Sequence, residues 1–145
     1  MAGTVVIGAD HGGFKLKELL KEWLSGKGYE VVDVGTSEVG SGSDYPDFAN
    51  ALAEYIGRNR AAFGALICRT GTGMTIAANR HRHIRAALLY STVAARLARE
   101  HSNANVAVLG SDAFSDDENI GFLNEFLVTK FTDEERHARR IEKIS

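Results

Sequence analysis

The sequence is poor in cysteine, since Cys68 is the only one in 145 residues. A single thiol cannot form an internal disulfide, and this scarcity is typical of proteins in a reducing compartment. The first residues also lack the basic start, apolar segment and cleavage site of a secretory signal peptide. We therefore expect a cytoplasmic protein.

Two further absences narrow the classes of function. The sequence contains no apolar run of about eighteen residues, the length that a membrane-spanning helix needs. The formal net charge of −2 provides no basic field that would hold nucleic acid. With 44% hydrophobic and 25% charged residues, the composition is that of an ordinary globular protein. We expect a single domain over residues 1–145, whose core needs neither disulfides nor metal.

Short apolar runs alternate with amphipathic segments along the whole chain. Strands are expected at residues 4–9, 30–34, 65–68, 84–89 and 105–109. Helical patterns with apolar residues near a 3.6-residue period cover residues 14–25, 46–59, 74–79, 92–101 and 118–130. A polar, glycine-rich loop is expected at residues 35–44.

This alternation predicts an α/β fold, because strand–helix–strand units place parallel strands beside one another with helices on the faces. We expect a doubly wound, Rossmann-like three-layer sandwich with a five-stranded parallel sheet and a C-terminal helix. That last helix should begin near Asp133, with Thr132 as its N-cap and Glu135 completing a capping box. It is rich in cations and poor in residues that could pack in a core.

The only thiol stands where a predicted strand meets a predicted helix, in the segment LICRTGTGMTIAANR at residues 66–80. In an open α/β sheet, ligands bind outside the carboxyl ends of the strands. The glycines among residues 70–73 permit tight backbone turns whose amides can face an anion. A neighbouring arginine and helix start favour the reactive thiolate form of Cys68. An inert core thiol followed by a plain turn is the alternative, and spacing alone leaves both open.

Several familiar motifs do not fit this chain. A nucleotide-triphosphate loop would need Gly-Lys-Ser/Thr where the sequence has Gly73, Met74 and Thr75. A cysteine phosphatase that resembled the protein tyrosine phosphatases would need an arginine at the position of Met74. The first turn, GADHGG at residues 8–13, is not the Gly-x-Gly-x-x-Gly fingerprint of dinucleotide-binding proteins.

Other polar side chains stand at the ends of predicted elements. Asp10 and His11 follow the first strand, Tyr45 precedes the second helix, and His101 ends the helix before the fifth strand. Each has a plain structural alternative, such as a helix cap for Asp10, a half-buried aromatic for Tyr45 and a partner of a helix C-terminus for His101. Grouped with the thiol, they indicate a site at the sheet edge. The RHRH cluster at residues 80–83 is better interpreted as a solvated loop, because its histidines do not share a helix face.

Six stretches carry a resemblance to a known family: GADHGGFKLK (8–17), DYPDFA (44–49), LICRTGTGMTIAANR (66–80), IRAAL (84–88), REHSNANV (99–106) and RHARRI (136–141). Through them the chain resembles the type B ribose-5-phosphate isomerases and their galactose-6-phosphate isomerase relatives over essentially its whole length. The resemblance implies an aldose–ketose isomerase that works through an enediolate without metal or cofactor, with ribose 5-phosphate and ribulose 5-phosphate as the default pair. A relative acting on a tetrose phosphate, a hexose phosphate or a free sugar is an alternative, as is a non-catalytic sugar-phosphate-binding protein.

The resemblance also implies roles for individual residues. Cys68 matches the family's catalytic base, His101 its ring-opening histidine, and Asp10 a residue near the sugar. Thr70 and the loop amides match the group that holds the developing oxyanion. Phosphate-binding positions are matched by His11, Arg136 and Arg140. The remaining expected substrate contacts are Tyr45, Arg69, Gly71, Thr72, Gly73, Ser102 and Asp112.

The resemblance further implies an assembly. In the family the active site is shared between two subunits, so we expect a homodimer or a dimer of dimers. Arginines four residues apart, such as Arg136 and Arg140, lie on one helix face and can reach the same phosphate. A shared site accounts for a terminal helix that is so cationic and so poor in core residues.

The chain departs from the family pattern at three places. Arg69 replaces the usual glycine after the cysteine, Ser102 and Asn103 replace the usual Asn-Asp, and Asp112 replaces an arginine that normally binds phosphate. The cation lost at position 112 and the cation gained at position 69 suggest that one change compensates for the other. Arg69 could bind the substrate's distal anion in place of the lost arginine. Alternatively, it could pair with Asp112, across the subunit boundary if the site is shared. The pair is favoured, because an unpaired aspartate beside phosphate costs binding, and an Arg69 that points into solvent is the plain alternative. The preferred sugar and the pathway stay open.

Overall fold

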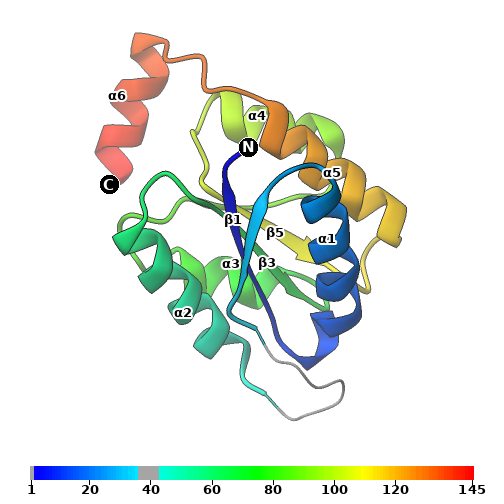
Figure 1. Ribbon diagram of the computed structural model, residues 1–145. Coiled ribbons are helices and arrows are strands. Elements are labelled where there is room, and N and C mark those ends of the chain that lie inside the picture. The colour runs from blue at the N-terminus through cyan, green and yellow to red at the C-terminus, as the bar shows by residue number, and fades with distance from the viewer. Residues whose placement is uncertain (1, 36–42) are drawn as a thin grey trace.

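The computed structural model describes residues 2–35 and 43–145 (Figure 1). Within these residues, five strands form one sheet in the order β2-β1-β3-β5-β4, and every neighbouring pair is parallel. The strands are β1 (Thr4–Ala9), β2 (Glu30–Asp33), β3 (Phe63–Cys68), β4 (Ala86–Leu88) and β5 (Val106–Gly110). The predicted doubly wound, Rossmann-like α/β sandwich is therefore confirmed.

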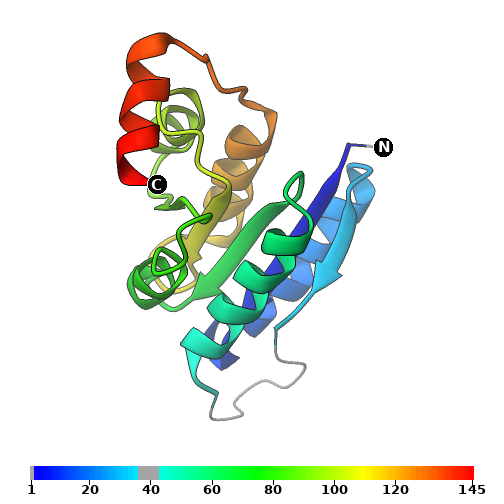
Figure 2. The ribbon, with the colours of Figure 1, turned by 90° about the vertical axis from the view of Figure 1, so that its left-hand side faces the viewer.

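Helices cover both faces of the sheet. They are α1 (Phe14–Gly26), α2 (Tyr45–Arg58), α3 (Thr72–Ala78), α4 (Thr92–Glu100), α5 (Asp116–Val128) and α6 (Glu135–Ile144), with a short 3-10 helix η1 (His11–Gly13) after β1. Side chains of α1, α4 and α5 pack in one core cluster, and those of α2 and α3 pack in the other. Figure 1 shows the sheet between these layers, with α2 on one side and α1 and α5 on the other, and Figure 2 looks at the sheet from the side of α2.

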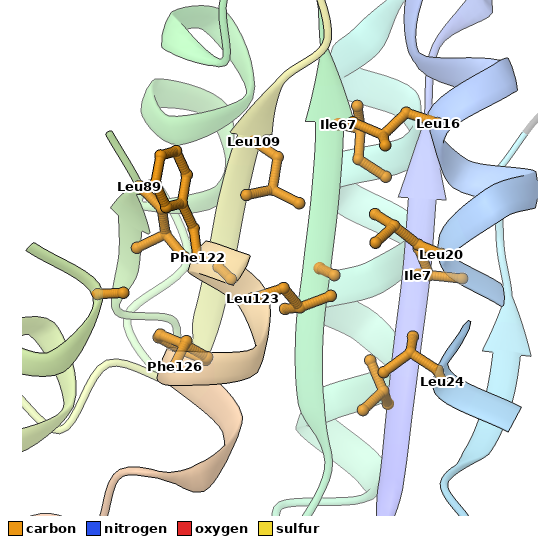
Figure 3. Close-up of a cluster of buried hydrophobic side chains, with 14 of the residues drawn as sticks. Ile7, Leu16, Leu20, Leu24, Ile67, Leu89, Leu109, Phe122, Leu123 and Phe126 are labelled. Carbon is orange, nitrogen blue, oxygen red and sulfur yellow. The ribbon is translucent and has the colours of Figure 1, made fainter. Parts of the chain in front are cut away.

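The two core clusters are formed by alternate residues of the same strands. Ile7 and Ile67 face the α1 and α5 side, where they meet Leu20 (Figure 3). Their neighbours Val6 and Leu66 face α2 and α3. Successive side chains of a strand point to opposite faces, so an uninterrupted apolar run indicates a strand that is buried on both sides.

Helix α6 lies apart from these layers. It stands beside α4 at the upper end of the molecule in Figures 1 and 2, on the side where β1 begins. Among its residues only His137 is buried. The helix therefore adds little to the core of its own chain.

The predicted capping box of the last helix is wrong. Helix α6 begins at Glu135, its N-cap is Glu134, and no side chain caps it. The hydroxyl of Thr132 instead donates a hydrogen bond to the carbonyl of Glu100 at 2.9 Å, and Asp133 takes a left-handed backbone with φ of 54°. A long-range contact has replaced the local cap.

Other element boundaries shift by a few residues. Strand β4 is shorter than expected, whereas β3 begins two residues earlier. Helix α5 begins at Asp116 because Ser115 caps it, with the Ser115 hydroxyl accepting from the amide of Glu118 and the Glu118 carboxylate accepting from the amide of Ser115. Of the predicted loop at residues 35–44, residues 36–42 lie outside the described residues.

Candidate active site

The carboxyl ends of three adjacent strands bring most of the predicted site residues together. In the strand register Ala9 of β1 faces Ile67 of β3, and Cys68 faces Gly110 of β5. The loops that follow these strands carry Asp10, His11, residues 68–73 and Asp112. The Ser111 hydroxyl donates to the carbonyl of Gly12 at 2.9 Å, which ties the first loop to the third.

Cys68 is the last residue of β3 and is only 6% exposed. Its Sγ accepts a hydrogen bond from the backbone amide of Gly71 at 3.1 Å. Gly71 has a φ of 85°, and a Cβ there would lie 2.5 Å from Cδ1 of Leu88. A residue with a side chain cannot take this position without strain. The glycine turn thus aims an N–H at the sulfur, an arrangement that suits a sulfur carrying negative charge.

Tyr45 packs on the same loop. A Cβ at Gly73 would lie 2.5 Å from the Tyr45 ring, so the absence of a side chain at Gly73 makes room for the ring. Thr70 and Thr72 are exposed at the turn, and the Thr72 amide lies 3.4 Å from the Thr70 hydroxyl oxygen. The hydroxyls of this loop are therefore available at the surface of the site.

Asp10 and His11 occupy the first loop. The Asp10 carboxylate caps η1, accepting from the amides of Gly12 at 3.0 Å and Gly13 at 3.2 Å. The plain alternative for Asp10, a helix cap, is thus realised at the sheet edge. Nδ1 of His11 lies 3.2 Å from the hydroxyl of Ser43, which also accepts from the His11 amide at 3.0 Å.

Arg69 and Asp112 form the predicted ion pair. Arg69 Nη1 donates to Asp112 Oδ2 at 3.1 Å, and the Asp112 amide donates to the Arg69 carbonyl at 2.8 Å. The pair closes within one chain and needs no subunit boundary. The Arg69 side chain also lies over Gly12, where a Cβ would come within 2.7 Å of it.

His101 and Ser102 lie far from Cys68 within the chain. They follow α4, at the edge where the strands begin, and Asn105 just beyond them bonds to the carbonyl of Arg85 that precedes β4. All of β5 separates this edge from Gly110, the register partner of Cys68. Arg136 and Arg140 lie on α6 at the same end (Figures 1 and 2). One chain therefore carries the two halves of the predicted site at opposite ends of its strands, one at their carboxyl ends and the other where they begin.

The second half centres on two stacked imidazoles. The rings of His101 and His137 have centroids 4.3 Å apart and planes inclined by 14°. They line a hollow of about 250 Å³ together with Ser102, Arg140, Ile141 and Ile144. Burial, and then the charges of His101 and Arg136, lower the pKa of His137.

A network missed by sequence reasoning holds the turn that carries His101. Arg99 is buried and donates to Asn103 Oδ1 at 2.9 Å and to the carbonyl of Ala104 at 2.6 Å. Arg85 donates to the carbonyl of Asn103 at 2.9 Å. Asn103 has a φ of 45°, a conformation that asparagine tolerates better than most residues. The only sequence signal was an arginine four residues before an asparagine.

Ser43 and Ser111 were also missed. Ser43 lies in the predicted loop at residues 35–44, and Ser111 follows the predicted fifth strand by two residues, which is a weak signal by itself. Residues 2–35 and 43–145 include no group of three or more His, Cys, Asp or Glu side chains placed to hold a metal ion. In the same ranges no helix is both long and apolar enough to cross a membrane.

Comparison with known proteins gives close matches over nearly the whole chain. A family model described as Ribose/Galactose Isomerase matches residues 5–144. A protein of Mycoplasma genitalium named probable ribose-5-phosphate isomerase B is 42% identical over 145 residues, covering 99% of this chain and 95% of that protein.

Solved structures agree with the sequence matches. A ribose 5-phosphate isomerase from Thermotoga maritima superposes with a TM-score of 0.93 at 47% identity, covering 97% of this chain and 96% of that one. Ribose-5-phosphate isomerase B from Mycoplasma genitalium, solved with bound ribulose-5-phosphate, superposes with a TM-score of 0.94 at 42% identity, covering 99% of this chain and 95% of that one.

Proposed function

Because the chain belongs to the ribose/galactose isomerase family, we propose that it is an aldose–ketose isomerase that interconverts ribose 5-phosphate and ribulose 5-phosphate. The observation that carries the proposal is the loop at the end of β3, where a glycine amide is aimed at the sulfur of Cys68. The relative solved with ribulose-5-phosphate supports the choice of sugar. The protein acts as a single domain in the cytoplasm, in line with its lone, unpaired thiol.

Cys68 is the base of this reaction. Its Sγ takes the C2 proton of the open aldose, and the electron pair left behind forms an enediolate with negative charge on O1. The same sulfur returns the proton to C1, while the hydroxyl proton of O2 passes to O1 and leaves the carbonyl at C2. Thr70 and the amides of the loop other than that of Gly71, which donates to the sulfur, hold the oxyanion, because they lie at the same end of the strands as the sulfur.

His101 opens the sugar ring. A cyclic aldose opens when its anomeric hydroxyl loses a proton and its ring oxygen gains one, which is a task for an imidazole near neutral pH. Asp10 lies near the sugar and Tyr45 borders it. Phosphate is held by His11, Arg136 and Arg140, while Ser102 adds a hydroxyl to the same end.

These roles require a second subunit. Cys68 and His101 lie at opposite ends of the strands of one sheet, so a complete site combines Cys68 of one copy with His101 of the other. Exposed apolar side chains on α3, α4 and α6 and just before α4 support such an interface: Ile76, Tyr90, Val93, Leu97 and Ile144. A hollow of about 430 Å³ between α3, β4, α4 and the end of α6 continues this surface. The assembly is a homodimer or a dimer of dimers.

Arg69 and Asp112 tune the phosphate end. Asp112 alone would repel a phosphate, and the guanidinium of Arg69 at 3.1 Å neutralises that charge. This pair also favours a second candidate function, an isomerase of the same family that acts on another aldose, either a tetrose or hexose phosphate or a free sugar. A purely sugar-binding role has less support, because binding does not need a buried sulfur held by a glycine amide.

An isomerase assay separates these functions. The panel contains ribose 5-phosphate, a tetrose phosphate, hexose phosphates and the free sugars, each measured with the native protein and with Cys68→Ala. We expect conversion of ribose 5-phosphate that the variant loses. Faster conversion of another sugar would assign that sugar instead, and conversion of none, with binding intact, would establish the binding role.

A further inference from the structure

His137 is the point at which α6 docks on its own chain. Although α6 carries ten residues, His137 is the one that is buried, at 5% exposure. Its ring lies flat against the ring of His101, which is itself exposed. The two histidines come from segments far apart in the sequence, so only the docking of α6 brings them together.

His137 has little contact with solvent, at 5% exposure. Its Nε2 is fully enclosed and makes no hydrogen bond to any described residue. The nearest carboxylate oxygen, Oε2 of Glu134, lies 3.5 Å away. A buried polar atom left without a hydrogen bond costs stability and calls for an explanation. The ring face of His137 instead packs against the ring face of His101.

Burial and the charges around the stack shift the pKa of His137. On α6 the groups near His137 are Arg136 and Arg140, with Glu134 opposing them, and on the α4 side the group is His101. Burial first, and then the charge of His101, lower the pKa of His137. Two imidazolium rings at 4.3 Å would repel each other, which agrees with the lowered pKa of His137.

We propose that His137 is a positioning residue, which holds the imidazole of His101 in the orientation that sugar ring opening needs. The inference rests on the proposed function of His101. A flat stack fixes the plane of the His101 ring, and a misplacement of about 1 Å in a reacting group can cost roughly 100-fold in rate. The stack also explains why a polar side chain is buried at this point.

The two sugars of the proposed reaction provide a built-in control. Ribose 5-phosphate is mostly a closed furanose, so its conversion requires ring opening. Ribulose 5-phosphate cannot close such a ring, because its 5-hydroxyl carries the phosphate. Exchange of its C1 proton with solvent deuterium therefore needs the base and the oxyanion loop but not His101. A residue that acts through His101 affects the first measurement and spares the second.

The test compares His137→Ala, His137→Phe and Lys143→Ala in both measurements. Phenylalanine keeps a flat ring against His101 without titrating, and Lys143 is a control on the same helix that is exposed and lies outside the hollow. We expect His137→Ala to slow ribose 5-phosphate conversion roughly 10- to 100-fold, with C1 exchange of ribulose 5-phosphate within about threefold of native. His137→Phe and Lys143→Ala should both stay within about threefold in both measurements.

Three results would overturn the inference. One is an equal loss in both measurements for His137→Ala, which would indicate a general structural role. Another is a phenylalanine variant no better than the alanine variant. The third is a changed pH dependence of conversion near neutral pH in His137→Phe, which would make His137 a proton carrier. Failure of the proposed function looks different, because the native protein would then show no C1 exchange.

Discussion

Arg69 Nη1 and Asp112 Oδ2 lie 3.1 Å apart and join the loop after β3 to the loop after β5. Both side chains are more than half exposed, at 61% and 56%, so their attraction adds little to folding stability. The effect of the pair is electrostatic and local: Arg69 neutralises the negative charge of Asp112 near the carboxyl end of β3, where Cys68 lies.

A double-mutant cycle tests this compensation. Arg69→Gly alone should weaken binding of a sugar phosphate, because it leaves the Asp112 carboxylate unpaired. Arg69→Gly with Asp112→Arg should restore binding, so the two changes should be strongly non-additive. Dissociation constants for ribose 5-phosphate, measured by calorimetry, give the coupling. Additive changes would mean that the two residues act independently.

Replacing the proposed base should separate chemistry from binding. Cys68→Ala should remove exchange of the C1 proton of ribulose 5-phosphate with solvent, a loss of about 10²–10⁴ in rate. Binding of the sugar should stay within about tenfold, because the methyl group occupies the same buried site. Deuterium incorporation measured by NMR decides the matter. If the variant keeps most of the native rate of C1 proton exchange, Cys68 is not the base and is only a buried core thiol.

The ring-opening role of His101 predicts a loss that depends on the substrate. His101→Asn should slow conversion of ribose 5-phosphate by about 10² or more, yet it should leave turnover of a four-carbon aldose phosphate nearly unchanged, since that sugar cannot cyclise. Initial rates on both substrates provide the comparison. Equal losses would count against ring opening.

A shared site makes a quantitative prediction for mixed chains. Cys68→Ala and His101→Asn homodimers should each be inactive on ribose 5-phosphate. When the two variants are unfolded and refolded together, half of the dimers are mixed, and one of the two sites in each mixed dimer is intact. Activity should therefore return to about a quarter of the native value. No recovery, with sedimentation showing dimers, would place both residues in the same subunit's site.

The glycine at the turn supplies a test of the loop itself. Gly71→Ala forces a side chain into a left-handed backbone and against Leu88, so we expect a loss of about 1–3 kcal/mol in the free energy of unfolding. It should also move the amide away from Cys68 and slow C1 exchange. Gly121→Ala in α5 is the matched control, because a Cβ there meets nothing within 4 Å. That change should be neutral or slightly stabilising. Equal effects of the two substitutions would contradict the assigned role of the turn.

Local patterns in the sequence determined most of the fold. The apolar run of β1 and the amphipathic period of α1 each lie within a few residues, and such periodicity predicts an element wherever its neighbours end up. The placement of Cys68 at the carboxyl edge followed from the strand–helix alternation. The pairing of Arg69 with Asp112 was predicted from the two positions at which the chain departs from the family pattern, although not that it closes within one chain.

Contacts between distant segments were decided only by the tertiary structure. Thr132 bonds to Glu100 instead of capping α6, and the ring of His137 stacks on His101, 36 residues earlier in the chain. Such contacts depend on strand order and on where a helix docks, and no short window of sequence contains that information. The separation of His101 from Cys68 is of the same kind. A helix that returns along a parallel strand ends where the strands begin, so the fold places the two halves of the proposed site at opposite ends of the strands.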